Sequence, residues 1–274
     1  MISVLTNTTS LYAQSYLSKS NTSLSDNLGR LSSGLRVRSA ADDAAGLAIS
    51  EDFKAKIRGL SQAKRNANDG VSLAQTADGA LKEMSGMLNR MRELAVQSAT
   101  GTINDEQRGY LNDEFSQLKE EVDRLAATTE FNGINLLNGD SATGIDFQVG
   151  AGNTANDRLT LSLATATASA LAINDNGISA ASKALSAISA LDSAITAISS
   201  KRGTIGAMQN RLSVTISNLS TYGTNLAAAN SRIVDVDVAS ETAMLSKNQI
   251  LVQAGASMLA QANQAPQIAL SLIG

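Results

Sequence analysis

The chain has 274 residues, a formal net charge of −3, and neither cysteine nor histidine. This composition excludes disulfides, metal sites built on thiolate or imidazole, and the usual catalytic triads, and the small charge gives no general attraction to nucleic acid or anionic membranes. Aromatic residues make up only 3% and Pro266 is the one proline, so the sequence favours long helices packed through narrow aliphatic seams.

The first predicted element is a helix that begins after about residue 9. Its leucines are spaced by seven, four, three and four residues, at Leu17, Leu24, Leu28, Leu31 and Leu35. This spacing places them on one face of a helix, and the group Ser32-Ser33-Gly34 favours a break there. The residues before the helix lack the basic region and apolar run of a cleavable secretory signal.

Two more helices are predicted before residue 130. The first has an apolar stripe at mostly helical spacing, at Phe53, Ile57, Leu60, Ala63, Ala67, Ala74, Ala77, Leu81, Met84, Leu88, Met91 and Ala95. Gly101 interrupts this pattern, and Asn104 or Asp105 is expected to cap the next helix. That helix has its apolar residues at Leu111, Phe115, Leu118, Val122 and Leu125.

After residue 130 the pattern changes to turns and short strands. Residues 131–140 are rich in asparagine and glycine, whereas residues 147–149 and 159–163 alternate between apolar and polar side chains. Residues 150–157 separate the alternating segments like a loop, so we expect two or three short strands.

A long helix is predicted from about residue 179 to about residue 233. Its apolar residues recur every seven positions, at Leu191, Ile198, Ile205, Leu212, Leu219, Leu226 and Ile233. A heptad repeat forms one stripe that other helices have to cover. Such a helix would be roughly 80 Å long.

The final helix is predicted to follow Asp235 and Asp237. Its apolar doublets are a heptad apart, at Met244-Leu245, Leu251-Val252, Met258-Leu259 and Leu272-Ile273. Pro266 lies where a further doublet would be, and we expect it to kink or interrupt the helix.

Together these elements predict a mainly α fold, a long antiparallel helical rod with terminal coiled-coil helices and a small β-hairpin region in mid-chain. We expect residues 1–43 and 234–274 to form a terminal helical domain, and residues 44–233 to form the body, with short strands at about 130–165. The stripes at both ends have no partner within their own helix. The predicted subunit-packing residues are Leu17, Leu24, Leu28, Leu31, Leu35, Leu245, Leu251, Val252, Met258 and Leu259.

Charged residues cluster where the terminal segments meet the predicted body. Arg30, Arg36 and Arg38 lie around the end of the first helix, and Asp235 and Asp237 precede the last one. In an out-and-back rod the two groups share one level and could pair across the junction. Exposed ion pairs contribute only about 0–1 kcal/mol, so we expect them to fix register, with simple solvation as the alternative.

No catalytic, cofactor-binding or metal site is predicted. The adjacent carboxylates at 42–43 and 120–121 cannot face each other on a helix, which makes a shared-proton pair unfavourable. No segment matches the glycine-rich phosphate loop. An enzyme is therefore the least favoured class.

Several long motifs occur in order along nearly the whole chain: SLYAQ at 10–14, RLSSGLR at 30–36, DDAAGLAI at 42–49, RMRELAVQ at 90–97, SK with QIL and QAG within 246–255, and LAQANQ at 259–264. Together they resemble bacterial flagellin, the subunit of the flagellar filament. The resemblance implies a structural protein that polymerises into the helical propeller used for swimming.

The same resemblance implies how the parts of the chain are used. In flagellins the terminal segments pair as coiled coils that line the inner tube of the filament, the body packs into the next tube, and outer domains are inserted in mid-chain. Only about 45 residues lie between the two helical halves here, which implies a short form that lacks large outer domains.

The partners implied by the resemblance are other copies of the chain, an export chaperone at the C-terminal helices, and the hook-associated junction and cap proteins. Export would pass through the flagellar secretion channel to an extracellular filament, without a cleaved signal peptide. A vertebrate Toll-like receptor would recognise Arg90, Leu94 and Glu114, although these residues could serve subunit packing alone. No cofactor, nucleic acid or membrane insertion is implied.

Two structural alternatives stay open. A hook–filament junction protein shares the terminal helices, but the full set of internal motifs and the absence of a larger insert favour a filament subunit. A signalling rod, such as the cytoplasmic hairpin of a chemoreceptor, is also long and based on heptads. A rod of that kind would be helical through its tip, whereas strands are predicted here.

Overall fold

The computed structural model describes residues 6–271, and the side chains of residues 6–264. Its elements in chain order are α1 (Thr8–Ser33), α2 (Ala44–Ala99), α3 (Asp105–Thr128), β1 (Glu130–Phe131), β2 (Ile134–Asn135), β3 (Ile145–Gln148), η1 (Ala155–Asp157), β4 (Arg158–Leu161), α4 (Ala181–Val234) and α5 (Val238–Ser271). The predicted mainly α fold with a small β-hairpin region is confirmed. The doublet at 272–273 lies outside the described residues.

The chain divides into two compact units. Unit 1 comprises Met1–Ile57 and Thr224–Gly274, and unit 2 comprises Arg58–Gly223. Both boundaries fall inside the long helices α2 and α4. The division at residues 43 and 234 follows the ends of helices instead, and it stays a prediction.

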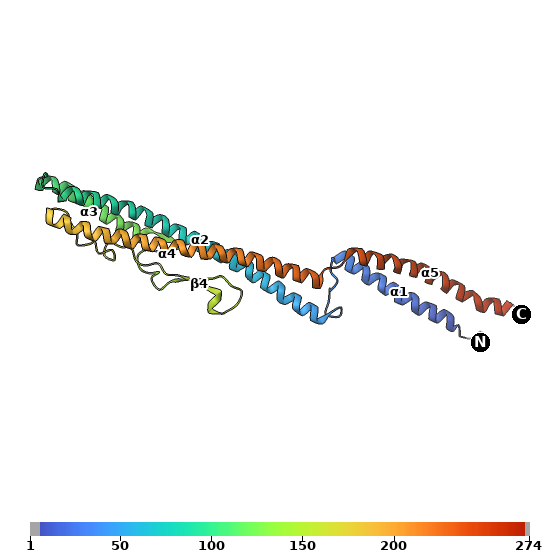
Figure 1. Ribbon diagram of the computed structural model, residues 1–274. Helices are drawn as coiled ribbons and strands as arrows, with labels where there is room; N and C mark the ends of the chain where they lie inside the picture. The colour runs from blue at the N-terminus through green and yellow to red at the C-terminus, as the bar shows by residue number, and fades with distance from the viewer. Residues whose placement is uncertain (1–5, 272–274) are drawn as a thin grey trace. The chain divides into compact units, whose positions relative to one another are not determined.

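In unit 1, α1 and α5 lie side by side and run antiparallel (Figure 1). At the start of α1, the side-chain oxygen of Asn7 accepts a hydrogen bond from the Ser10 N–H, and its amide donates to the Ala262 carbonyl on α5 at 2.7 Å. The helix ends at Gly34, whose φ of 71° is the left-handed conformation typical of a glycine C-cap. The predicted break at this glycine is confirmed.

The core of unit 2 is formed by the apolar stripes of α2, α3 and α4, which run alongside one another (Figure 1). Heptad residues of α4 are buried from Leu191 to Leu212, and so are the α2 residues from Leu81 to Met91 at the predicted spacing. Asn104 begins α3 with a capping box that it shares with Gln107, as its position after the glycine predicted. Arg202 of α4 pairs with Asp78 of α2 at 2.8 Å.

Two short hairpins follow α3. The expected pairing of alternating segments is present, since β3 and β4 are antiparallel with Phe147 opposite Leu159. Within the turn-rich segment, which falls in the range expected to hold short strands, β1 and β2 form a second hairpin. Its turn is Asn132-Gly133, with φ values of 52° and 77°, the asparagine–glycine pair that favours tight hairpins.

An irregular segment after β4 supplies a part of the core that no periodicity indicated. Its buried residues are Leu163, Ala166, Ala168, Leu171, Ile173 and Ile178. Side chains of α3 satisfy its backbone: Asp123 accepts from the Ala168 N–H at 2.7 Å, and Asn112 accepts from the Ile178 N–H at 2.8 Å. The segment can therefore be buried without regular secondary structure.

Helix α5 continues through Pro266 to Ser271. The predicted interruption at this proline is therefore wrong. A long helix tolerates a proline where neighbouring turns hold the helical conformation, at the loss of one backbone hydrogen bond.

Candidate functional site

The terminal helices of unit 1 leave large apolar side chains in solvent. Tyr12 and Tyr16 on α1 are 68% and 71% exposed, and Met258 on α5 is 65% exposed. An open groove of about 520 Å³ runs between the two helices; it is lined by Thr9, Tyr12, Ala13, Tyr16, Leu17, Ser20, Leu251, Ala254, Gly255 and Met258. Contiguous exposed apolar surface of this kind marks an interaction site.

The predicted subunit-packing residues divide into two sets. The half-buried set consists of Leu17, Leu24, Leu31, Leu35, Leu245, Val252 and Leu259. The exposed set consists of Leu28, Leu251 and Met258. A Cβ at Gly255 would lie 3.3 Å from the Cδ1 of Leu17, so the two helices approach closely at this glycine. The half-buried set thus includes residues of the seam within one chain, while the exposed set faces outward.

Heptad reasoning missed the two tyrosines of this surface. Tyr12 and Tyr16 are four residues apart and therefore share a face of α1. Leu11 on α1 and Ile250 on α5 are exposed as well. We define the terminal apolar face as the exposed residues Leu11, Tyr12, Tyr16, Leu28, Met244, Ile250, Leu251 and Met258. The i, i+4 spacing of the tyrosines was the available signal for the surface.

The junction segment after α1 is held to the segment before α5 by backbone hydrogen bonds. The Arg36 N–H donates to the Val234 carbonyl at 2.6 Å, and the Val236 N–H donates to the Gly34 carbonyl at 3.0 Å. Leu35 and Asp235 form an antiparallel bridge between these bonds. The segment after α1 and the segment before α5 are therefore joined by main-chain hydrogen bonds within unit 1.

The predicted charge pairing takes a different form. Arg30 lies 3.7 Å from Asp42, and Arg38 lies 3.6 Å from Asp26, so neither pairs with Asp235 or Asp237. The guanidinium of Arg36 donates instead to the backbone carbonyl of Ile233. Asp235 takes part through its backbone, and Asp237 accepts from the N–H groups of residues 239 and 240 as the cap of α5.

Asp42 organises the junction segment. Its carboxylate accepts from the N–H groups of Arg38 and Ser39 at 3.1 and 3.0 Å, and from the Ser39 hydroxyl at 3.1 Å. These bonds favour the charged form and lower the pKa of Asp42, the Arg38 N–H contributing most. The carboxylate thus folds the segment onto itself through local hydrogen bonds.

The lowered pKa predicts a pH dependence for the junction. A carboxyl with a depressed pKa in the folded state contributes stability above its ordinary pKa, and this contribution is lost as the pH falls through the folded value. We expect Asp42→Asn to lower the dissociation temperature of assembled chains near neutral pH, measured by light scattering. The gap to the unsubstituted chain should shrink below about pH 4; a gap that stays constant under acid conditions would contradict the role of Asp42.

The residues predicted to form a receptor surface do not share one exposed face. Arg90 on α2 pairs with Glu114 on α3 at 2.8 Å and with Glu93 at 3.1 Å, and hydrogen bonds to these carboxylates, first that to Glu114, raise the pKa of Arg90. Leu94 is only 1% exposed and belongs to the core of unit 2. Its predicted place on a receptor surface is wrong, because the same helical stripe that carries Met84 and Leu88 buries it.

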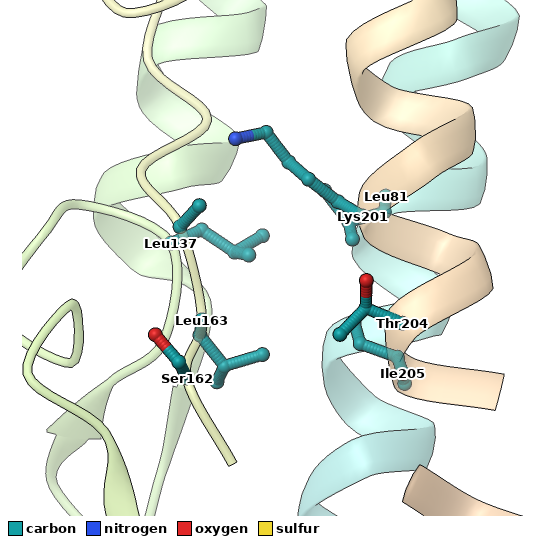
Figure 2. A pocket seen from close by; sticks show the side chains of 8 residues that line it. Leu81, Leu137, Ser162, Leu163, Lys201, Thr204 and Ile205 are labelled. Carbon is teal, nitrogen blue, oxygen red and sulfur yellow. The ribbon is translucent and has the colours of Figure 1, made fainter. Parts of the chain in front are cut away.

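A small cavity lies in unit 2 beneath Lys201 of α4. Figure 2 shows the lysine stem extending across it toward the segments that carry Leu137 and Leu163. The cavity measures about 60 Å³, and burial lowers the pKa of Lys201 because desolvation penalises its charged form. The hydroxyls of Ser162 and Thr204 at the cavity already donate to backbone carbonyls. The arrangement is that of a lysine covering apolar residues with its stem.

The described part of the chain shows no cluster of three or more carboxylates that could hold a metal ion. Among residues 6–271, no helix is long and apolar enough to cross a membrane. The exposed apolar residues of α1 and α5 are the surface of unit 1 that favours apolar contact with a partner.

Comparison with known families gives two matches. The bacterial flagellin N-terminal helical region matches residues 4–142, and the bacterial flagellin C-terminal helical region matches residues 188–273. Together these two ranges contain α1, α2, α3 and α5 in full, and all of α4 except its first residues.

Curated relatives match over nearly their whole length. The flagellar filament 33 kDa core protein of Treponema phagedenis is 45% identical and is covered over 98% of its length by 97% of this chain. A flagellin of Halalkalibacterium halodurans is 50% identical, with 89% of both chains covered. The flagellin of Bacillus subtilis is 43% identical, with 94% of this chain and 95% of the relative covered.

Solved structures agree with this similarity. The crystal structure of Bacillus cereus flagellin has a TM-score of 0.52 at 36% identity, covering 61% of this chain and 94% of that one. The structure of a putative flagellar hook-associated protein from Vibrio parahaemolyticus has a TM-score of 0.58 at 13% identity, covering 71% and 100%. At that identity the second structure shares the fold alone.

Proposed function

We propose separate roles for the terminal and central parts of this chain, which belongs to the bacterial flagellin family and is a structural subunit of the flagellar filament. Residues 1–43 and 234–274 form the terminal domain that lines the filament core, and residues 44–233 form the body around it. The observation that carries this proposal is the terminal apolar face on α1 and α5.

Burial of this face requires other copies of the chain. Helices of 26 and 34 residues that pack mainly on each other leave their outer sides in water. Every apolar side chain buried on assembly contributes about 1.5–3 kcal/mol, so several tyrosines, leucines and methionines per subunit supply a strong driving force. The same patch repeated by a screw operation gives contacts that do not close and hence a helical filament.

Ordering of the terminal helices is coupled to assembly. In a free subunit, the α1–α5 pair has one apolar side packed and one exposed, and isolated two-helix pairs are marginally stable in water. A filament binds the ordered form of the ends only and therefore stabilises it by mass action. A free subunit should consequently contain less helix than the assembled one.

Further partners of the chain would bind the same exposed apolar residues. The exposed apolar residues of α5, such as Ile250 and Met258, require cover before assembly, which suits an export chaperone that binds the C-terminal helices. The hook-associated junction and cap proteins would bind the same ends at either end of the filament. Export as an unfolded chain through the flagellar secretion channel requires no cleaved signal peptide.

Recognition by a vertebrate Toll-like receptor would have to use the exposed ion pair between Arg90 and Glu114. Both side chains are about half exposed, at 50% and 44%. Their charges lie on neighbouring helices and form a polar patch that a receptor could bind. Leu94 takes no part, because it lies in the core.

Far-UV circular dichroism during seeded polymerisation tests the proposal. Purified subunits are mixed with short filament fragments, and the spectrum is recorded before and after elongation. We expect filaments by electron microscopy together with a gain in helix signal, corresponding to the ordering of α1 and α5. Filament growth without a change in helix content would contradict coupled ordering, and a subunit that never elongates would favour a junction protein.

A further inference from the structure

Unit 1 contains every buried polar side-chain atom that lacks a hydrogen-bond partner within the described part of the chain. The five atoms are Asn27 Nδ2, Arg30 Nε, Ser50 Oγ, Asn230 Oδ1 and Glu241 Oε1. A buried donor or acceptor without a partner costs about 1–3 kcal/mol, so each requires an explanation. Three of them belong to α1 and α5, the helices that carry the terminal apolar face.

The antiparallel register of α1 and α5 predicts that these three residues lie at one level of the pair. Asn7 bonds to Ala262, and Leu17 approaches Gly255, further along α1 and earlier on α5. Continuing this antiparallel register places Arg30 of α1 opposite Glu241 in the first turn of α5. Asn27 lies one turn before Arg30 and shares its face.

Asn27 and Glu241 are almost completely buried although the pair has only two helices, whereas 33% of the Arg30 side chain is exposed. Asn27 is 7% exposed and Glu241 is 6% exposed. The junction segment covers this turn of α1, since the guanidinium of Arg38 lies against Gly29 and pairs with Asp26. Arg30 turns one end of its guanidinium toward Asp42, which leaves its Nε on the enclosed side.

The chemistry of the three atoms is complementary. Asn27 Nδ2 and Arg30 Nε are donors, whereas Glu241 Oε1 is an acceptor. A water molecule can accept two hydrogen bonds and donate one, and buried waters make about three such bonds. One water within hydrogen-bond reach of all three atoms would therefore satisfy both donors and the acceptor.

We propose that Asn27, Arg30 and Glu241 form a buried polar site that holds one water molecule between α1 and α5 and fixes the register of the two helices. The site deepens the proposed function, on which it rests, because register sets how the terminal apolar face is presented to neighbouring subunits. Apolar seams tolerate sliding by a turn, whereas a slip here would leave two donors and a carboxylate buried and unpaired.

Two substitutions of Glu241 separate hydrogen bonding from bulk. Glu241→Gln keeps an acceptor oxygen and the side-chain size, and serves as the matched control. Glu241→Leu removes the acceptor, so a slip that brings Arg30 and Asn27 to other partners or to solvent is opposed only by the main-chain bonds between residues 34–36 and 234–236. The chain has no cysteine, so spin labels attached at Ser15→Cys and Ser246→Cys are unique.

Labelled chains are incorporated at low fraction into filaments of the unlabelled, unsubstituted chain, and the distance between the labels is measured by pulsed electron paramagnetic resonance. The labelled positions are offset along the pair by about ten residues, roughly 15 Å, so a slip changes their separation directly. We expect one distance for the unsubstituted chain and for E241Q. For E241L we expect a second distance displaced by about 5 Å, one helical turn.

An unchanged single distance in E241L would overturn the register role, and a shift in E241Q equal to that in E241L would do the same. A high-resolution map of the unsubstituted filament should show water density bonded to all three groups; a direct bond between Arg30 and Glu241 without water would overturn the water site. Failure of the unsubstituted chain to form filaments would overturn the proposed function itself.

Discussion

Truncation of Phe115 to alanine is expected to destabilise unit 2 by about 3–5 kcal/mol, the usual cost of removing a buried aromatic ring. Phe115 lies on α3, is fully buried and belongs to the core shared with α2 and α4. The core contains few aromatic residues, so no neighbouring ring can fill the space. Urea denaturation followed by far-UV circular dichroism measures the loss as a lower midpoint.

Tyr110→Ala on the same helix is the matched control. Tyr110 is 66% exposed and its hydroxyl bonds to Glu106 at 3.3 Å within α3, so its removal should cost less than about 1 kcal/mol. Similar losses for both variants would show that α3 is held by something other than the buried face described here. A loss below about 1 kcal/mol for Phe115→Ala would mean that the site collapses around the missing ring.

The helices could be predicted from the sequence because their signals are local and repeated. The heptad residues from Leu191 to Leu212 and the stripe from Leu81 to Met91 are buried as their spacing requires. Gly34 ends α1 because it adopts the left-handed backbone conformation, and Asn104 begins α3 because its side chain caps the first turn. In each case a single residue decides where the helix ends or begins. A long helix repeats its apolar pattern many times, so a single ambiguous residue does not change the prediction of a helix.

The irregular parts could not be predicted in the same way. The buried residues between 163 and 178 belong to the core shared with the long helices, and Asp123 and Asn112 of α3 bond to the backbone of this segment. No period in the sequence records such long-range bonds. The Asn132-Gly133 turn is different, since its dipeptide is a recognised hairpin signal and could have been used.

The candidate site was predicted in outline and not in detail. The stripes on α1 and α5 pointed to an assembly surface, but periodicity alone does not separate residues that face a helix of the same chain, such as Leu17, from those that face outward, such as Met258. The charges near the junction have other partners than the predicted ones. Arg30 and Arg38 pair with Asp42 and Asp26, which are closer in sequence than Asp235 and Asp237. Asp237 instead caps α5.

Removal of both chain ends is expected to abolish filament growth. A chain without residues 1–40 and 236–274 lacks α1, most of the junction segment and all of α5, and with them the terminal apolar face. Unit 2 lies wholly within the remaining chain and should still unfold cooperatively in urea, which shows that any loss of growth is not a loss of folding.

A full-length variant guards against an indirect effect of truncation. Ile250→Asp with Met258→Asp places two charges on α5 at positions that are both 65% exposed. The free subunit should tolerate them, whereas burial of unpaired carboxylates in a filament costs several kcal/mol each. We expect this variant to stop elongation, and Ser257→Asp, at an exposed position on the same helix, tests whether charge alone does so.

The most direct measurement is electron microscopy of seeded subunits, comparing the full chain with the chain that lacks residues 1–40 and 236–274. Filaments from the full chain and none from the truncated chain are the predicted result. If the truncated chain elongated the seeds equally well, the terminal helices could not be the polymerising surface.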